Sequence, residues 1–161
     1  MSQDANGTDA RGTLLAVCVG PGGIPNHSVE SARADANGLE GDKHRFHLHG
    51  GEDRAVCLIT QAEVDALERD GVPQRPHGAF GENLRLDGID PAVLRPGDRL
   101  AIGDEVVVEL FEVREPCKTL RSLDSRFPDL MVGRSGWVGR VVRPGELRAG
   151  QPVVRAAANA R

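Results

Sequence analysis

The sequence contains no tyrosine, one tryptophan and four phenylalanines, so aromatic side chains make up only 3% of its 161 residues. Branched aliphatic residues must therefore fill most of the hydrophobic core. The chain also lacks an excess of positive charge, since its formal net charge is −4 at pH 7. A protein without an overall basic field has little electrostatic affinity for nucleic acid or for an acidic membrane surface, so we expect neither as a partner.

Long apolar segments are missing as well. The longest runs, LLAVCV and VVVELF, are far shorter than the roughly 20 residues of a membrane-spanning helix. Met1 is followed by the polar stretch SQDANGTDA, which lacks the basic and apolar regions of a secretory signal peptide. The three cysteines are odd in number and irregularly spaced, which argues against a disulfide framework. We therefore expect a cytoplasmic protein with reduced thiols.

Turn-forming residues divide the chain into short segments. Twenty glycines and ten prolines interrupt it, and the segments between them are rich in Val, Leu and Ile, as in the strands of a barrel or sandwich. The length suits one domain, which we place at residues 12–155 between tails at 1–11 and 156–161. The predicted strands are 12–19, 54–59, 83–86, 98–102, 105–113, 136–142 and 151–155. The pattern predicts a mostly β fold.

One helix is well marked in the segment TQAEVDALERDG. Thr60 and Glu63 have the spacing of a capping box, Val64 and Leu67 share one face, and Gly71 is a typical stop. A second short helix is predicted after Pro116, through CKTLRSL, and the following residues 125–136 are predicted to form a loop. Both helices should lie at the periphery of the sheet.

The three cysteines have different surroundings. Cys18 and Cys57 lie inside apolar strand runs, where we expect buried, structural residues. Cys117 follows Pro116, which favours a helix start, and unpaired N–H groups there stabilise a thiolate. Basic residues surround it in the sequence: Arg114, Lys118, Arg121 and Arg126. A thiolate can attack electrophiles, carry a persulfide or bind a soft metal, whereas the alternative is a loop cysteine on a charged surface.

Three of the five histidines fall in the segment HRFHLHGGEDR. In an extended chain His47 and His49 share a face and His44 points the other way. Zinc needs a third protein ligand, and no C-x-x-C or H-E-x-x-H pattern supplies one, so we do not expect a zinc site. Alternatively, the glycines after His49 allow close approach of the backbone to an anion that Arg54 could neutralise.

Several segments in this order resemble the MOSC domain family, named for the C-terminal domain of molybdenum cofactor sulfurases. They are GLEGDKHR (38–45), HGGEDRAVCL (49–58), FGENL (80–84), PGDRLAIGD (96–104), REPCKTL (114–120) and GWVGRVVRPGELRAGQPV (136–153). The resemblance extends from about Gly12 to Val154. It implies a β-barrel with short peripheral helices and a single functional cysteine, Cys117.

The resemblance implies two kinds of chemistry at Cys117. In the family's reductases this cysteine ligates molybdenum carried by a pterin cofactor, and those enzymes reduce N-hydroxylated compounds. In other members it is proposed to receive sulfur as a persulfide from a pyridoxal-phosphate-dependent cysteine desulfurase. An oxidoreductase would need a separate electron donor, because this chain carries no domain that stores electrons.

The resemblance also implies a set of cofactor-binding residues around Cys117. They are His49, Gly50, Gly51, Arg54, Glu82, Asn83, Lys118 and Arg140. Asn83 and Glu82 would contact the edge of the pterin, while the basic side chains would balance phosphate and molybdate charge. For Glu82 and Asn83 the alternative is a buried turn network. The chain departs from many relatives after its first Gly-Gly, where Asn26 and His27 replace a basic residue.

Three functions remain open from the sequence. The first is a molybdenum-cofactor-dependent oxidoreductase acting on a small molecule, with Cys117 as metal ligand. The second is a sulfur carrier or sulfurtransferase, including carbon–sulfur bond chemistry, with Cys117 as persulfide or nucleophile. The third is a non-catalytic cofactor carrier.

Overall fold

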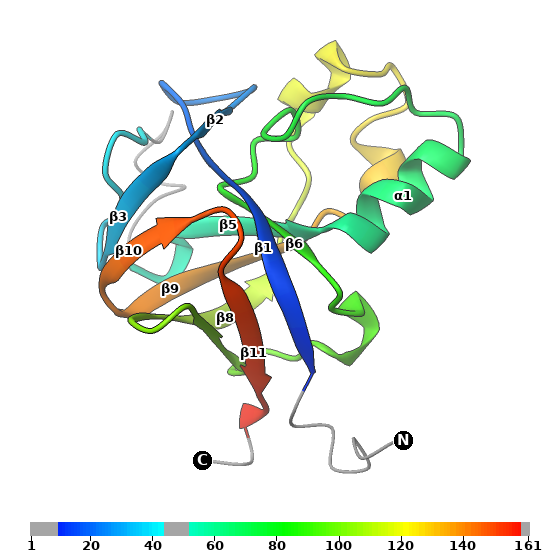
Figure 1. Cartoon of the computed structure of the whole chain (residues 1–161). Helices are drawn as coiled ribbons and strands as arrows, with labels where there is room; N and C mark the ends of the chain where they lie inside the picture. The colour runs from blue at the N-terminus through cyan, green and yellow to red at the C-terminus, as the bar shows by residue number, and fades with distance from the viewer. Residues whose placement is uncertain (1–9, 44–51, 159–161) are drawn as a thin grey trace.

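The computed structural model describes residues 10–43 and 52–158. Its main sheet has the strand order β11-β7-β8-β9-β5-β6-β1-β2, and β11 also pairs with β1. This extra pairing closes seven strands into a barrel, which is visible around the centre of Figure 1. The predicted mostly β, barrel-containing fold is confirmed.

The barrel strands match the seven predicted segments within about two residues at each end. They are β1 (Arg11–Val19), β5 (Val56–Thr60), β6 (Leu84–Asp87), β7 (Arg99–Ile102), β8 (Val106–Val113), β9 (Trp137–Arg143) and β11 (Pro152–Ala156). Neighbouring strands are antiparallel except β5 and β6, which are parallel. A parallel pair needs a crossover, and the helix between these two strands provides it.

The described residues contain further short strands outside the seven segments. β2 (His27–Val29) extends the main sheet beside β1, and a separate sheet has the order β10-β3-β4. Its strands are β3 (Ser31–Asp35), β4 (Gly38–Leu39) and β10 (Gly145–Arg148). They have little sequence signal, because β3 places only alanines on its buried face and the others have two to four residues.

Two clusters of apolar side chains form the core. The larger fills the barrel with aliphatic residues such as Leu14, Leu86 and Val108, as the low aromatic content predicts. The smaller packs Ile59 and Phe80 with residues of α1 and the 123–131 segment. Figure 1 shows α1 and the segment after Pro116 (yellow) together at one side of the barrel. The pocket described below lies where this side lobe meets the barrel.

The helix α1 (Gln61–Arg69) begins with the predicted capping box. Thr60 Oγ1 accepts from the Glu63 N–H at 3.2 Å, and Glu63 Oε1 accepts from the Thr60 N–H at 3.0 Å. Burial raises the pKa of Glu63, whereas the hydrogen bonds that its carboxylate accepts from Thr60 and Gly136 oppose the shift. Its second oxygen accepts from the Gly136 N–H at 3.1 Å, which fixes the start of the helix to the start of β9.

Within residues 10–43 and 52–158, the other helical segments are 3₁₀ helices. They are η3 (Glu52–Arg54), η4 (Pro91–Val93), η5 (Lys118–Ser122) and η6 (Asp129–Met131). The helix predicted after Pro116 is therefore a 3₁₀ helix, with Cys117 in the extended conformation at its N-cap. Across the ranges that the structure describes, no helix combines the length and apolar character needed to cross a bilayer.

Candidate functional site

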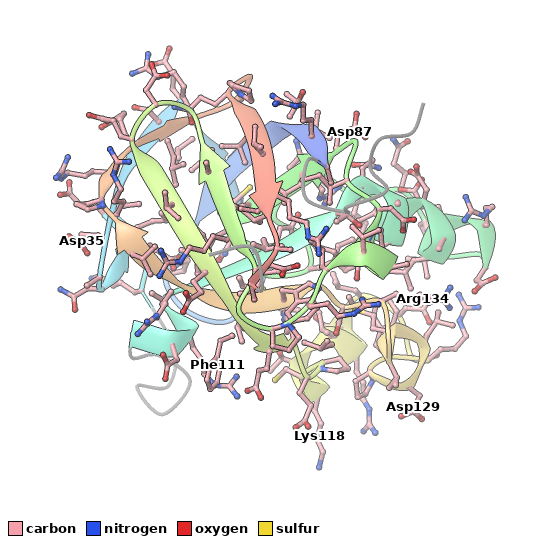
Figure 2. The ribbon with its side chains drawn as sticks, turned by 90° about the horizontal axis from the view of Figure 1, so that it is seen from below. Asp35, Asp87, Phe111, Lys118, Asp129 and Arg134 are labelled. Atoms are coloured by element: carbon pink, nitrogen blue, oxygen red, sulfur yellow. The ribbon has the colours of Figure 1, made fainter. Side chains whose placement is uncertain are left out.

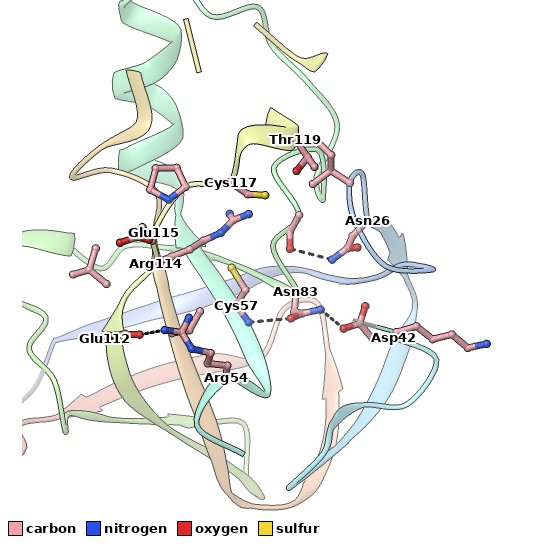
Figure 3. A pocket seen from close by; sticks show the side chains of 17 residues that line it. Asn26, Asp42, Arg54, Cys57, Asn83, Glu112, Arg114, Glu115, Cys117 and Thr119 are labelled. Atoms are coloured by element: carbon pink, nitrogen blue, oxygen red, sulfur yellow. Dashed lines mark hydrogen bonds and ion pairs between the residues drawn. The ribbon is translucent and has the colours of Figure 1, made fainter. Parts of the chain in front are cut away.

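A pocket of about 560 Å³ lies at one end of the barrel. Its walls are formed by β5, the segment before β6, the end of β8 with residues 114–119, and the loops around residues 23–26 and 42–43. This volume falls in the range of roughly 300–1,000 Å³ that is typical of small-molecule sites. Figure 3 shows that its labelled side chains come from segments far apart in the sequence.

Asn83 lines this pocket and connects three segments of the chain. Its Nδ2 donates to the Cys18 carbonyl and to Asp42 Oδ2, both at 3.1 Å, while its Oδ1 accepts from the Cys57 N–H at 2.9 Å. Both amide hydrogens are thus used within the protein. The hydrogen bonds of Asn83 hold Asp42 and the backbone of Cys57 in place, and its contact with a cofactor stays a prediction.

Asp42 is a pocket carboxylate that the sequence reasoning missed. One oxygen accepts from Asn83, and the other accepts from the Gly20 N–H at 2.9 Å. A carboxylate has about four acceptor positions, so Asp42 keeps acceptor capacity beside the pocket. The signal was present in the segment GLEGDKHR, where an acidic residue follows a glycine turn.

Arg114 is the second residue that the sequence reasoning did not assign to the site. Figure 3 shows its guanidinium pointing into the pocket between Cys57 and Cys117. Its Nη1 is buried and has no hydrogen-bond partner within the described ranges. Because a buried guanidinium nitrogen without a partner is costly, this geometry favours binding of an anionic group.

The cysteines occupy two different environments. Cys18 is fully buried, as predicted, with its Sγ 3.9 Å from the Ser28 hydroxyl. Cys57 was expected in the core, but it is half-buried and faces the pocket together with Cys117. Burial raises the pKa of the Cys57 thiol, and the positive charge of Arg114 partly opposes this shift. The prediction that Cys57 is a buried core residue was wrong. Successive side chains of β5 point to opposite faces, so Val56 and Leu58 face the barrel core and Cys57 does not.

The buried Cys18 thiol should make stability fall in alkaline solution. Burial raises its pKa from 9.0 to about 11. The unfolded chain therefore loses this proton at a lower pH than the folded protein does. The contribution of the thiol to the free energy of unfolding is fully present below pH 9, and roughly 2–3 kcal/mol of it is lost as the pH rises toward 11. Urea unfolding from pH 8 to 11 should show this decrease in the wild type and a smaller one in Cys18→Ala. Equal slopes in the two proteins would contradict the assignment. Tyrosine is absent, so no phenol titrates in this range.

Arg54 is in the pocket, as predicted, and forms an ion pair with Glu112 at its edge. The two side chains are 37% and 44% exposed. Exposed ion pairs contribute little stability, so a more highly charged anion in the pocket can compete for this guanidinium. Arg54 can therefore contribute to anion binding without loss of the fold.

Glu82 lies behind the pocket wall instead of lining it. It is 0% exposed, and its carboxylate accepts from the N–H groups of Gly78 at 2.9 Å and Phe80 at 3.2 Å. It also pairs with the buried Arg85, whose Nη2 is 2.5 Å from Oε2. These contacts are those of the buried turn network considered as the alternative for this residue.

Two of the remaining predicted residues, Lys118 and Arg140, do not line the pocket. Lys118 is exposed, and Figure 2 shows its side chain pointing away from the molecule. Arg140 faces outward from β9, because the residues on either side of it, Gly139 and Val141, are buried. Its Nε lies 3.2 Å from Glu109 Oε1. His49, Gly50 and Gly51 lie outside the described residues, as do His44 and His47, so their roles stay predictions. Within the described part of the chain, no group of three or more His, Cys, Asp or Glu residues could hold a metal ion.

Together, the fold and the pocket define a β-barrel domain with a small-molecule site that combines two thiols, guanidinium groups and carboxylates. The model of the MOSC domain family matches residues 45–154. The chain belongs to the MOSC domain family.

Curated relatives are similar over most of this chain. A protein of Gibberella moniliformis named "Reductase" is 31% identical over 128 residues, which are 73% of this chain and 22% of the relative. Protein YiiM of Escherichia coli is 34% identical over 125 residues, 72% of this chain and 55% of the relative. The chain thus covers less than two thirds of the length of these relatives.

Solved structures have the same fold. YiiM from Escherichia coli superposes with a TM-score of 0.73 at 27% identity, over 91% of this chain and 70% of that one. YiiM from Geobacillus stearothermophilus has a TM-score of 0.75 at 24% identity, over 91% and 75% of the two chains. The latter similarity supports the fold alone.

Proposed function

We propose that this protein binds a molybdenum–pterin cofactor in the pocket, with Cys117 as the protein ligand of the metal. The main support is Arg114, whose buried Nη1 lacks a partner in the described structure and lies in the same pocket as the Cys117 thiol. Such a cofactor carries anionic phosphate and a thiophilic metal, and this pocket offers a cation for the first and a sulfur ligand for the second. The family's association with this cofactor agrees with the proposal.

The residues of the pocket fit the different parts of such a cofactor. Arg114, Arg54 and Lys43 would supply positive charge for the phosphate and for the metal group. Asp42, held by Asn83, can accept hydrogen bonds from the N–H groups of a pterin ring. We therefore assign to Asp42 the role that the sequence had suggested for Glu82.

When bound, the cofactor would supply a redox-active metal. Its electrons would come from a separate donor protein, and its substrate would be a small molecule, for which N-hydroxylated compounds are the proposed class. A relative that is named a reductase supports this class of reaction. The half-buried thiols at the pocket suit a reducing compartment, and we propose that the protein acts in the cytoplasm.

Arg114→Met tests whether this guanidinium holds an anionic cofactor. Removing a buried charged hydrogen-bond donor costs roughly 1.5–3 kcal/mol, so we expect at least a tenfold loss of cofactor occupancy at limiting supply. Occupancy is measured as molybdenum by mass spectrometry and as pterin by the fluorescence of its oxidised form. Arg140→Met is the matched control, because it removes an arginine outside the pocket and should leave both values unchanged. Equal occupancy in the two variants would contradict the role of Arg114.

A second candidate function is sulfur carriage on Cys117, and one observation favours it. The pocket contains another thiol, Cys57, which metal binding through Cys117 alone does not require. In this function Cys117 would receive sulfur as a persulfide from a cysteine desulfurase. Incubation with such an enzyme and cysteine should add one sulfur atom to Cys117, detectable in the mass of its peptide.

A further inference from the structure

Cys57 is a pocket thiol for which the molybdenum proposal has no use. It lies within β5, and both its pairing with Val138 of β9 and the bond from its N–H to Asn83 Oδ1 fix its backbone. Figure 3 shows the Cys57 sulfur pointing from β5 toward the segment of Cys117, whose sulfur points into the same space. The fold thus directs two thiols from distant parts of the chain into one cavity.

The two pocket thiols are more exposed than Cys18, and they lie in different kinds of backbone segment. Both are half-buried, whereas Cys18 is fully buried beside Ser28. Cys57 is on a rigid strand, while Cys117 lies at the junction of a connecting segment and a short 3₁₀ helix. A disulfide requires Cα atoms roughly 4.4–6.8 Å apart, so the inference requires that the segment of Cys117 can bring its Cα within this range of Cys57.

We infer that Cys57 is the resolving thiol for sulfur carried by Cys117, so that the protein accepts sulfane sulfur from persulfides or polysulfides and releases it as sulfide. This inference rests on the sulfur-carrying function proposed for Cys117. In this reaction Cys57 is the second reacting residue, sulfide is the product, and the protein ends with a disulfide between Cys57 and Cys117.

The chemistry balances in two steps of thiol–disulfide exchange. The Cys117 thiolate attacks a terminal sulfur of a tetrasulfide dianion, which forms the Cys117 persulfide anion and releases a trisulfide dianion. The sulfur of Cys57 then attacks the Cys117 sulfur, the bond to the outer sulfur breaks, and the Cys57 proton leaves with the product as HS⁻. Cys57 and Cys117 end as a disulfide, which an added dithiol reductant returns to two thiols.

The guanidinium of Arg114 points into the space between the two cysteines, where its charge can act on either sulfur, and it must move aside before the two sulfur atoms bond. Its charge favours the thiolate and persulfide anions over their protonated forms. Burial and the carboxylates of Glu82, Glu63 and Asp42 raise the pKa of Cys57, whereas Arg114 lowers it, so the second step should accelerate as the pH rises above neutral. Arg114→Met should slow this step at a given pH.

The test uses the full chain, reduced and then treated with sodium tetrasulfide. In wild-type protein we expect sulfide to be released and a peptide pair joined through Cys57 and Cys117 to appear in the mass spectrum. In Cys57→Ser we expect the extra sulfur to remain on Cys117 and sulfide release to fall at least tenfold. Cys18→Ala is the matched control and should behave like the wild type.

The outcomes separate the two proposals. If Cys117 gains sulfur but Cys57→Ser releases sulfide at the wild-type rate, the resolving role is overturned and sulfur carriage stands. If Cys117 gains no sulfur, sulfur carriage itself fails, and this inference fails with it. Oxidation of the wild type with diamide tests proximity directly, since a resolving thiol must give the disulfide between Cys57 and Cys117. Absence of that disulfide overturns the inference.

Discussion

Cys117→Ser should reduce the molybdenum content of the purified protein to background. A serine hydroxyl is a harder ligand than a thiolate and stays protonated at neutral pH, so it cannot replace the sulfur ligand. Protein expressed in cells that make the cofactor would be analysed for metal and pterin beside Cys18→Ala, which removes a buried thiol outside the pocket. We expect the control to retain wild-type occupancy.

The pterin content of the same variant separates the alternatives. Arg114, Arg54 and Asp42 remain in Cys117→Ser, so part of the pterin can stay bound while the metal is lost. If the protein is a non-catalytic carrier that binds the cofactor through these residues, Cys117→Ser would keep both pterin and molybdenum. Unchanged molybdenum in Cys117→Ser would therefore contradict ligation by Cys117.

Arg85→Met should cause the largest loss of stability among the substitutions considered. Arg85 and Glu82 are 2% and 0% exposed, and Arg85 also donates to Gln61 Oε1 at 3.0 Å. Removing one partner of a buried ion pair leaves the other charge uncompensated, which costs about 3–5 kcal/mol. Urea unfolding at neutral pH measures this difference.

Two further variants show whether the cost comes from the buried charge. Glu82→Gln combined with Arg85→Met removes both charges and should recover part of the loss. Arg99→Ala breaks a partly exposed pair with Glu109, and we expect a loss of less than about 1 kcal/mol in the free energy of unfolding. A loss in Arg85→Met no larger than in Arg99→Ala would contradict the structural role of this pair.

Local patterns predicted the strands and α1 well. The strands between glycine and proline turns are short and aliphatic, and each must bury an apolar face, so pattern and structure agree. Thr60 and Glu63 form the expected capping box because both of its bonds involve residues three apart in the chain. The 3₁₀ form of η5 was not predicted, since a proline and a helical composition do not distinguish it from an α-helix.

The residues that line the pocket were harder to predict, because they depend on which face of each segment is turned toward the pocket. The alternation of Val56, Cys57 and Leu58 placed Cys57 opposite the barrel core, a signal that was available but outweighed by the apolar character of the segment. Glu82 and Asn83 are adjacent, yet one is buried with Arg85 and the other lines the pocket. Their separate roles depend on pairing between distant segments, which one sequence does not reveal.

The most direct test of the account is the molybdenum and pterin content of the wild-type protein after expression in cells that make the cofactor. We expect both to copurify with the protein, close to one of each per chain at full loading. Protein that contains neither, purified beside a known molybdenum–pterin protein that retains both, would contradict cofactor binding in this pocket.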